Sequence, residues 1–519
     1  MRNIINIINF VRGSIDPRFP TRDNVATVKN QLALMDEHSL TGTFLLEYDA
    51  LIKPEYTSLF DGTRHEIGGW FETVQPLVED SGLVWRGRDG YSWDWFANVG
   101  TMSAYMPRER ELLIDCFMNK FKEIFGYIPL SVGAWVWDAH SLRYLKERYG
   151  VKAACICKEQ YGTDGYTLWG GYYNGGYYPS ENNALSPAPN GEKQISLPVF
   201  RMLGIDPVDQ YDYGMNFESD IDAAQDVITL EPSCNGVGGA DPAWVDWYFT
   251  QNFGKENGSY AYAQVGQENG MSWESMKDGL RYQFCRLNEL KEKLDLHIEK
   301  LSETGEWFSR TYSITPQSVC FCDNDSANSG KKSFWYNCSK YRVNFFSDKD
   351  GFRVRDLYVF SSEQKGRYLY EPCLTESCAY YTLPVIDGNR WSGNGIRAGI
   401  YFRDAESDEK VLCSDMAVTA TETEAKAEAL TERFGKIVIC CKANGEISVC
   451  PEKNYSDLRL RFCCDRSRTD ILRIRKNPHT MCCRFGNVDY GISLFGGVFS
   501  EQCDEICLCE NRIIMCTDF

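Results

Sequence analysis

The chain has 519 residues, more than the roughly 250–300 at which one hydrophobic core stops growing, so two or three domains are expected, and two is the count used below. Its 43% hydrophobic and 25% charged residues exclude a fibrous or largely disordered chain. The net charge of −18 argues against nucleic-acid partners, and no apolar run reaches the roughly 20 residues that span a bilayer. The apolar opening at Ile4–Val11 is short and lacks a signal cleavage site, so we expect a strand here and a cytoplasmic protein without membrane partners.

From the N-terminus to about residue 308, apolar runs alternate with amphipathic stretches, which is typical of βα units in a mostly parallel sheet or barrel. The pattern predicts seven strands, at Ile4–Val11, Thr41–Glu47, Glu66–Trp70, Ser131–Trp137, Lys152–Cys157, Pro198–Leu203 and Tyr260–Gln267, with an additional candidate at Asp226–Leu230. Helical spacing of apolar residues predicts four helices, at Asn24–His38, Pro107–Phe125, His140–Tyr149 and Ser275–Leu296. The segment Gly162–Gly191 is rich in Gly, Tyr, Asn and Pro and is expected to be a long loop.

Beyond Thr315 and Pro316 the helical periodicity fades, and short alternating runs separated by turn signals predict antiparallel strands. The helix expected in this part is Glu422–Phe434. The expected fold class is therefore α/β, an irregular seven-stranded (β/α) barrel over 1–315 followed by an antiparallel β-sandwich-like domain over 316–519.

Seventeen of the 22 cysteines fall from Cys320 onward, which makes the second domain cysteine-rich. Adjacent pairs and C-x-C steps occur, but paired C-x-x-C motifs do not, and only five histidines are present. This pattern favours buried reduced thiols over a zinc site. A secreted disulfide scaffold is the alternative.

Charged and aromatic residues gather near the predicted strand ends, and active sites of parallel barrels are built at the carboxyl ends of the strands. Buried charges need partners, so their concentration near four strands indicates a polar cavity. The candidates near these strands are Arg12, Asp16, Arg18, His65, Glu66, Trp70, Glu72, Trp137, Asp138, His140 and Glu268. A buried salt-bridge network is the alternative for the charged members, and Asp138 also suits the N-cap of the helix that follows it.

Further candidates for sugar binding lie in other segments, where aromatic faces stack on sugars and polar groups accept hydroxyl hydrogen bonds. They are Asp164, Trp169, Arg201 and Trp273. For each tryptophan, packing in the core is the alternative.

The run Thr43–Leu51 followed by His65–Trp70 resembles the second and third strands of the superfamily of polysaccharide deacetylases and glycoside hydrolase families 38 and 57. That resemblance implies an irregular seven-stranded barrel, often with a β-sandwich behind it. Blocks at Phe125–His140, Gly162–Gly171 and Gln264–Trp273 resemble an uncharacterised bacterial family of the same superfamily. The likeness covers about the first 360 residues.

The metal motifs of that superfamily are incomplete in this chain. Its deacetylases hold a divalent metal with an Asp pair after the first strand and two histidines near the third, whereas this chain has His65 with Trp70 in place of the second histidine. A zinc site would need Asp16, His65 and His140 in an unfamiliar arrangement. We therefore expect no metal cofactor and keep zinc as an alternative.

Family 57 enzymes place a carboxylate pair after the fourth and seventh strands, and this analogy implies Asp138 as nucleophile or base and Glu268 as general acid. The expected function is a carbohydrate-active hydrolase acting on an oligosaccharide or polysaccharide, as a metal-free glycoside hydrolase. The alternatives are a metal-dependent deacetylase and a non-catalytic carbohydrate-binding protein.

Overall fold

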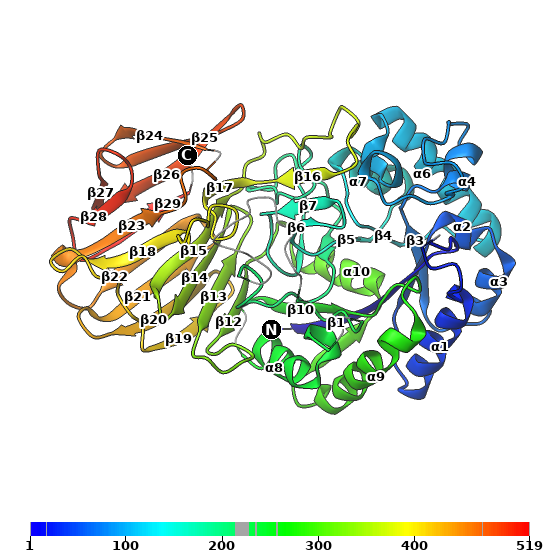
Figure 1. Cartoon of the computed structure of the whole chain (residues 1–519), viewed down its shortest axis with the longest axis horizontal. Helices are drawn as coiled ribbons and strands as arrows, with labels where there is room; N and C mark the ends of the chain where they lie inside the picture. The colour runs from blue at the N-terminus through cyan, green and yellow to red at the C-terminus, as the bar shows by residue number, and fades with distance from the viewer. Residues whose placement is uncertain are drawn as a thin grey trace.

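The computed structural model describes residues 2–16, 18–212, 228–233, 236–255, 258–469 and 471–517. An N-terminal half of parallel strands and helices lies beside a C-terminal half built almost entirely of strands (Figure 1).

Parallel strands form the central sheet of the N-terminal half. They follow the order β10-β1-β2-β3-β4-β5-β9-β8, and every neighbouring pair is parallel except β8 with β9. The strands are β1 (Arg2–Val11), β2 (Thr43–Leu46), β3 (Glu66–Trp70), β4 (Ser131–Ala134), β5 (Ala153–Ile156), β8 (Gly176–Tyr177), β9 (Val199–Arg201), β10 (Tyr260–Val265) and β11 (Leu296–Glu299), which pairs with β1. They are buried along nearly their whole length, as in a parallel sheet that is covered on both faces.

The sheet is nearly closed into a barrel. Within the described residues no backbone ladder joins β10 to β8 or β9, but side chains bridge the two edges of the sheet. The Tyr260 hydroxyl exchanges hydrogen bonds of 2.7 and 2.8 Å with the backbone of Gly176, and the rings of Phe200 and Tyr262 lie 5.0 Å apart.

All seven predicted strands are present, but the expected count of seven is too low. β8 has two residues, too few to show a period, and β11 begins at Leu296, where a helix was expected to end. Of the additional candidate Asp226–Leu230, residues 226 and 227 lie outside the described residues.

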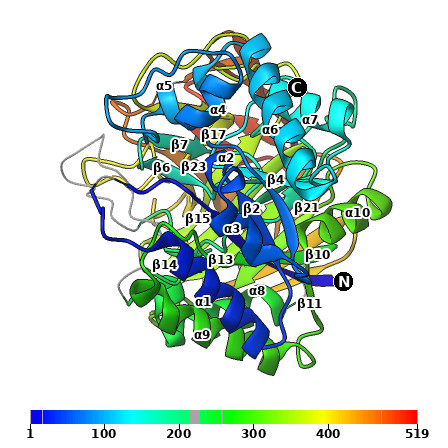
Figure 2. The same cartoon turned by 90° about the vertical axis from the view of Figure 1, so that its right-hand side faces the viewer.

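Helices cover the outside of the barrel (Figure 2). They are α1 (Asn24–Glu37), α2 (Tyr48–Leu51), α3 (Pro54–Thr57), α4 (Gln75–Asp80), α5 (Ala97–Gly100), α6 (Pro107–Phe125), α7 (Ala139–Tyr149), α8 (Pro242–Phe253), α9 (Trp273–Leu290) and α10 (Leu301–Thr311). α1, α6, α7 and α9 match the predicted helices. α6 and α7 both end at a left-handed glycine, Gly126 and Gly150, which costs no steric strain. In the part of the chain that is described, no helix has the length and apolar character to cross a membrane.

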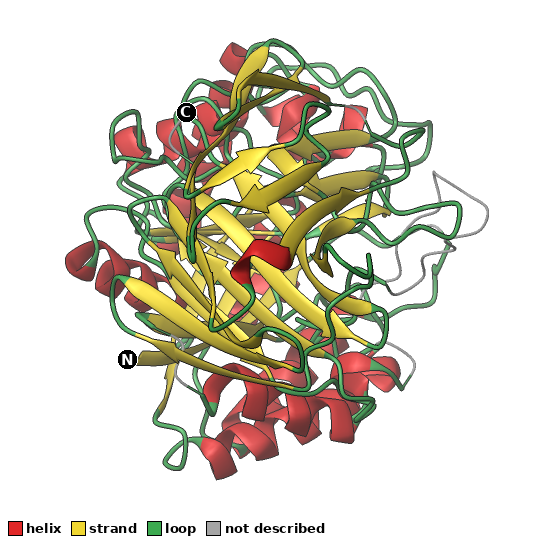
Figure 3. Cartoon of the chain, turned by 90° about the vertical axis from the view of Figure 1, so that its left-hand side faces the viewer, coloured by secondary structure: helices red, strands yellow, loops and turns green. Residues whose placement is uncertain are grey.

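The C-terminal half contains two antiparallel sheets, viewed with their strands in yellow in Figure 3. The first has the order β12-β13-β14-β15-β18-β23-β28-β27, with β17 beside β15, and the second has the order β19-β20-β21-β22-β29-β26-β25-β24. The strands of the first are β12 (Ser318–Cys322), β13 (Lys332–Asn337), β14 (Tyr341–Asp348), β15 (Gly351–Val359), β17 (Leu383–Ile386), β18 (Gly399–Asp404), β23 (Leu458–Cys463), β27 (Gly497–Phe499) and β28 (Glu505–Leu508). Those of the second are β19 (Asp415–Ala420), β20 (Glu424–Thr431), β21 (Gly435–Lys442), β22 (Glu446–Pro451), β24 (Leu472–Asn477), β25 (Thr480–Phe485), β26 (Val488–Phe495) and β29 (Ile513–Cys516).

Side chains of both sheets share one hydrophobic core, which gives the sandwich-like arrangement that was expected. Phe334 and Phe352 of the first sheet belong to it, together with Ile439 and Ile492 of the second.

The predicted helix Glu422–Phe434 is wrong, because β20 occupies this segment. Its Ala, Glu and Lys residues favour a helix, but its burial alternates with a period of two, and Ala425, Ala427 and Ala429 face the core. Pairing with β19 and β21 on both sides overrides the local propensity.

A small sheet joins the two halves. It has the order β16-β7-β6, where β6 (Gln160–Thr163) and β7 (Tyr166–Trp169) follow the barrel strand β5, and β16 (Cys378–Tyr381) comes from the C-terminal half. The expected boundary at residues 315 and 316 falls between α10 and β12, although β16 crosses back to the barrel. The boundary therefore stays a prediction.

The 21 cysteines of the described residues are all free thiols. We expect the unfolded protein to react with a thiol reagent at nearly all of its 22 cysteines without prior reduction. Titration of the denatured protein with and without reductant measures this, and a large increase on reduction would contradict it. The expected cytoplasmic location also stays a prediction, and this titration bears on it.

Candidate active site

A cavity of about 740 Å³ opens where the strands of the barrel end. Arg12 and Asp16 reach it from the loop after β1, Glu72 from the loop after β3, and Glu268 from the loop after β10. Trp135, the first residue after β4, also lines it. The carboxyl ends of neighbouring parallel strands meet at one end of the barrel, so residues distant in sequence converge there.

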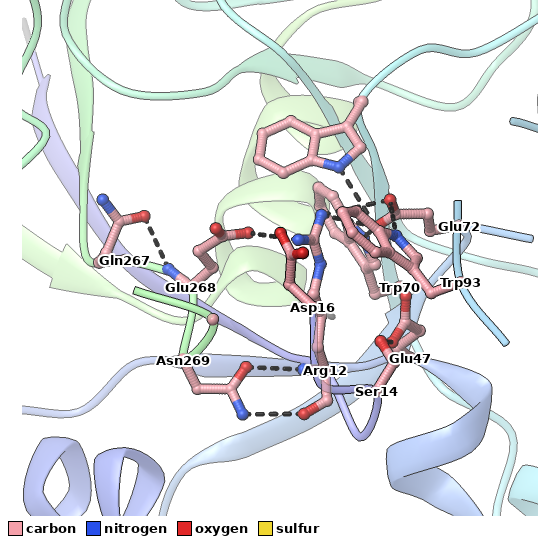
Figure 4. A network of polar contacts seen from close by, with 12 residues as sticks. Arg12, Ser14, Asp16, Glu47, Trp70, Glu72, Trp93, Gln267, Glu268 and Asn269 are labelled. Atoms are coloured by element: carbon pink, nitrogen blue, oxygen red, sulfur yellow. Dashed lines mark hydrogen bonds and ion pairs between the residues drawn. The ribbon is translucent and has the colours of Figure 1, made fainter. Parts of the chain in front are cut away.

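Arg12 lies between two carboxylates at the centre of this cavity (Figure 4). Its Nη2 is 2.9 Å from Glu72 Oε2, and its Nη1 is 3.3 Å from Glu268 Oε2. Asn269 fixes the backbone of Arg12, because its amide accepts from the Arg12 N–H at 2.7 Å and donates to the Arg12 carbonyl at 2.9 Å. The loops after β1 and β10 are thereby held together.

Three tryptophans hold the Glu72 carboxylate. The indole N–H groups of Trp70, Trp93 and Trp135 donate to it at 3.2, 2.5 and 3.3 Å. The Arg12 guanidinium lies 4.6 Å from the Trp93 ring centroid. Glu72 therefore has four donors in a fixed geometry, which suits a carboxylate that anchors Arg12.

Glu268 is a cavity carboxyl group whose pKa lies well above its ordinary value. Burial raises its pKa to about 7, although Arg12 acts in the opposite direction, and Glu72, Glu231 and Asp164 add repulsion that also raises it. At neutral pH both protonation states are populated, as a general acid or base requires.

A second buried carboxyl group lies beside this centre. Burial, followed by the charges of Asp49 and Glu72, raises the pKa of Glu47 well above its ordinary value. Glu47 follows β2, and its carboxylate accepts a hydrogen bond of 3.4 Å from Ser14. Glu47 lies in the run Thr43–Leu51 that carries the sequence resemblance, but it was not among the predicted site residues.

The raised pKa of Glu268 predicts a pH-dependent stability difference between the wild type and Glu268→Gln. A carboxyl group with a folded-state pKa near 7 stabilises the protein fully below its unfolded pKa of about 4.5, and this contribution is lost as pH rises through 7. From pH 4.5 to 8 we expect the variant to gain about 1–3 kcal/mol in unfolding free energy relative to the wild type. Urea unfolding at each pH measures this gain, and parallel pH profiles would contradict it.

Six of the predicted residues line the cavity. They are Arg12, Asp16, Arg18, Glu72, Asp164 and Glu268. Asp16 and Arg18 form an ion pair of 2.5 Å at the rim, where the Arg18 guanidinium lies 4.1 Å from the Trp95 ring centroid.

Asp138 lies outside this cavity. Its side chain accepts from the Ser141 N–H at 3.0 Å, which makes it the N-cap of α7, and it forms a fully buried ion pair of 2.9 Å with Arg110. The structure therefore does not bring Asp138 and Glu268 into one cavity, and the expected carboxylate pair is not formed. The N-cap that the sequence offered as the alternative is confirmed.

His65 and Glu66 lie at the opposite, amino end of the barrel strands. Glu66 opens β3 and accepts hydrogen bonds from Thr43 and Ser131, which open β2 and β4. His65 accepts from the Gly42 N–H at 3.3 Å, and burial lowers its pKa to about 4. Both residues lie at the start of β3, far from its carboxyl end, and neither lines the cavity.

The other predicted residues also lie outside the cavity lining. Trp70 and Trp137 are buried in the barrel core, although Trp70 donates to Glu72. The remaining four are at other places in the fold: His140 beside Glu111 at 3.2 Å, Trp169 donating to Asp387 at 3.1 Å, Arg201 buried at the end of β9, and Trp273 at the start of α9.

The three side chains considered as zinc ligands do not lie close enough together to bind one ion. Asp16 lines the cavity, His65 lies at the amino end of the barrel and His140 contacts Glu111, so the three residues are not gathered at one place. Nowhere in the described ranges do three His, Cys, Asp or Glu side chains come together in a way that would hold a metal ion. We therefore assign no step to a metal.

No protein-family model and no curated protein sequence matches the chain. The fold resembles a crystal structure from Parabacteroides distasonis described as a candidate glycoside hydrolase/deacetylase, with a TM-score of 0.51 and 17% identity over 73% of this chain and 87% of that chain. The likeness is one of fold. Two structures described as candidate polysaccharide deacetylases, from Mycobacterium smegmatis and Pseudomonas aeruginosa, align with TM-scores of 0.37 and 0.36, at 14% and 12% identity, over 61% and 60% of this chain and 92% and 93% of theirs.

Several residues of the cavity were missed by the sequence analysis. Trp93 and Trp95 lie between α4 and α5 in a stretch without strand periodicity, so no rule placed them at the strand ends. Lys158 follows β5 and Glu231 follows the additional strand candidate Asp226–Leu230, so their positions after predicted strands were the available signal. Glu376 comes from the C-terminal half, where no signal pointed to the barrel.

Proposed function

We propose that this protein is a carbohydrate-active hydrolase and that Glu268 is its acid–base residue. The observation that carries the proposal is a buried carboxyl group at the carboxyl end of a barrel strand, with a pKa near 7 and the Arg12 guanidinium 3.3 Å away. The fold likeness to a structure described as a candidate glycoside hydrolase/deacetylase supports a sugar substrate. An oligosaccharide or polysaccharide is the partner we expect.

Of the two hydrolytic reactions, we favour removal of an acyl group from an acetylated sugar over cleavage of a glycosidic bond. The pair of carboxylates expected for a glycosidase is not formed, because Asp138 is bound to Arg110. Glu72 faces the same cavity but is engaged by four donors. Glu268 is the cavity carboxyl group whose pKa is raised to about 7, and one such acid–base group suffices for acyl hydrolysis.

In this reaction the ionised Glu268 takes a proton from a water molecule as the water oxygen forms a bond to the acetyl carbonyl carbon. The Arg12 guanidinium stabilises the oxyanion that develops. The bond from this carbon to the sugar nitrogen or oxygen then breaks, and Glu268 returns the proton to the leaving atom. The products are acetate and the deacetylated sugar.

Acetylated sugars and aryl glycosides, incubated with metal-free and with zinc-supplemented protein, test the proposal. We expect acetate release without added metal. Release of a reducing sugar instead would indicate a glycoside hydrolase, and activity that appears only with zinc would contradict the assignment to Glu268 alone. Sugar binding without either product would favour a non-catalytic binding protein.

A further inference from the structure

A segment of the C-terminal half returns to the barrel and reaches the cavity. The chain leaves β15 at Val359 and rejoins the sheet at Leu383 of β17, which pairs with Val359. Between them, residues 361–381 extend over the barrel beside α7 (Figure 1). We call residues 361–381 the strap.

Backbone hydrogen bonds fix the tip of the strap on two barrel segments. The carbonyl of Glu376 accepts from the N–H of Ala97 at 2.8 Å, and the N–H of Cys378 donates to the carbonyl of Gly165 at 3.0 Å. β16 then pairs in parallel with β7. The tip therefore has a defined backbone, although its side chains are exposed to solvent.

Two residues of the tip, Glu376 and Ser377, line the cavity. Asp164, in the turn between β6 and β7, lines it as well, and its φ of 56° places this turn in a left-handed conformation. Neither Asp164 nor Glu376 takes part in an ion pair within the described part of the chain. Both carboxylates are therefore available to accept hydrogen bonds from a ligand.

The outer part of the cavity is continuous with its centre. The charge of Asp164 contributes to the raised pKa of Glu268, so the two carboxyl groups lie within electrostatic reach of each other. The volume of about 740 Å³ falls within the roughly 300–1,000 Å³ of pockets that bury ligands of several rings. A single reacting sugar beside Glu268 leaves the part of the cavity that Asp164 and the strap tip line together for another group.

We propose that the strap tip and the β6–β7 turn form a subsite for a second sugar residue of an oligosaccharide whose first sugar lies beside Glu268. The inference rests on the proposed function and names its substrate class, a chain of at least two sugars. The carboxylates of Glu376 and Asp164 accept hydrogen bonds from the hydroxyls of the second sugar, and the Ser377 hydroxyl both donates and accepts.

Binding by the full chain carrying Glu268→Gln tests the subsite without consuming the probe. The probes are N-acetylchito-oligosaccharides and O-acetylated xylo-oligosaccharides of one to five units, titrated by calorimetry. We expect affinity to rise at least about tenfold from one to two units, as hydrogen bonds to charged groups predict. Adding Glu376→Gln or Asp164→Asn is expected to remove most of this rise and to leave monosaccharide binding unchanged.

Two features make these variants well matched. Both are isosteric, and asparagine adopts the left-handed conformation of residue 164 as readily as aspartate does. Glu371→Gln changes an exposed carboxylate of the strap that does not line the cavity, so it is expected to bind every probe as the parent does.

Equal affinity for one and two units overturns the subsite, as does unchanged binding by the Glu376 and Asp164 variants or binding of no probe at all. The same measurements distinguish failure of the proposed function from failure of the subsite. A wild type that hydrolyses no probe but shows binding that depends on length and on Glu376 contradicts the hydrolase and supports the subsite. A wild type that hydrolyses monomers and oligomers with equal kcat/KM supports the hydrolase and overturns the subsite.

Discussion

Replacement of Glu268 by glutamine is expected to lower kcat by about 10²- to 10⁴-fold, the usual contribution of a positioned acid–base group. The amide keeps the shape of the side chain but can neither take up nor release the proton that the reaction transfers. KM is expected to change little, because the outer part of the cavity is intact. Steady-state kinetics on the acetylated sugar that releases acetate measures the loss.

The pH profile of the wild type distinguishes the role of this group. If ionised Glu268 is the base of acyl hydrolysis, kcat/KM rises as pH increases through about 7, the value to which burial raises its pKa. If Glu268 is instead the protonated acid of a glycosidase, kcat/KM falls above the same pH. In either case the limb near pH 7 is expected to be absent from the residual activity of Glu268→Gln.

Glu111→Gln is the control for both measurements. Glu111 is a partly buried carboxylate that contacts His140 at 3.2 Å, and it does not line the cavity. Its variant is expected to retain the wild-type kcat and pH profile. Wild-type turnover by Glu268→Gln would show that this residue is not the acid–base group.

The barrel strands could be predicted from the sequence because strands that are buried on both faces form short, mostly apolar runs. β5 and β10 are apolar over nearly their whole length, and the turns around them are polar. β8 was missed because two residues show no period, and β11 was missed because the predicted helix Ser275–Leu296 extends to its first residue. β20 shows the reverse problem, since its composition favours a helix and only its pairing with β19 and β21 makes it a strand.

The candidate site was predictable where a residue directly follows a strand. Arg12, Glu72 and Glu268 were found in this way, because parallel strands bring their carboxyl ends together. Asp138 also follows a strand, but the first turn of α7 and the buried Arg110 engage its carboxylate. A residue's position after a strand indicates which end of the barrel it occupies, but it does not determine where the side chain points.

Residues carried by long loops were not predictable. Trp93 reaches Glu72 from a stretch of turns between α4 and α5, and its hydrogen bond depends on the tertiary path of that stretch. Glu376 is more than 100 residues beyond β10 along the chain and approaches through the strap. Contacts of this kind depend on how the two halves pack together, which no local pattern encodes.

Replacement of Arg342 by methionine is expected to lower the unfolding free energy by about 3–5 kcal/mol, the usual cost of removing one partner from a buried ion pair. Arg342, on β14, lies 2.9 Å from Glu159 of the barrel half and 2.6 Å from Asp356 of β15, and all three side chains are fully buried. Without the guanidinium, two carboxyl groups would remain in a site that water does not reach.

The loss is expected to grow with pH. Burial raises the pKa of Asp356 to about 7 even beside Arg342, and removal of that cation raises it further. A carboxyl group with a raised folded-state pKa stabilises the protein at low pH, and that contribution is lost as pH rises through the folded pKa. Urea unfolding at pH 5 and pH 8 should therefore show the larger deficit at pH 8.

Two further variants separate the ion pair from general effects of mutation. Adding Glu159→Gln and Asp356→Asn to Arg342→Met removes the two buried carboxyl groups that have lost their partner, and it should recover part of the unfolding free energy. Arg484→Met, which breaks an exposed pair of 2.6 Å with Asp489, should leave the unfolding free energy nearly unchanged. A deficit in Arg342→Met no larger than that of Arg484→Met would contradict the buried network.

Arg342→Met is also expected to affect the reaction, because Arg342 of the C-terminal half contacts Glu159 of the barrel half. Glu159 adjoins Lys158, which lines the cavity, and Gln160, where β6 begins on its way to the turn that carries Asp164. Loss of Arg342 frees this segment and is expected to raise KM for oligosaccharides more than it lowers kcat, because Glu268 and Arg12 are held by β1 and β10 instead. Equal changes in both constants would show that the network serves stability alone.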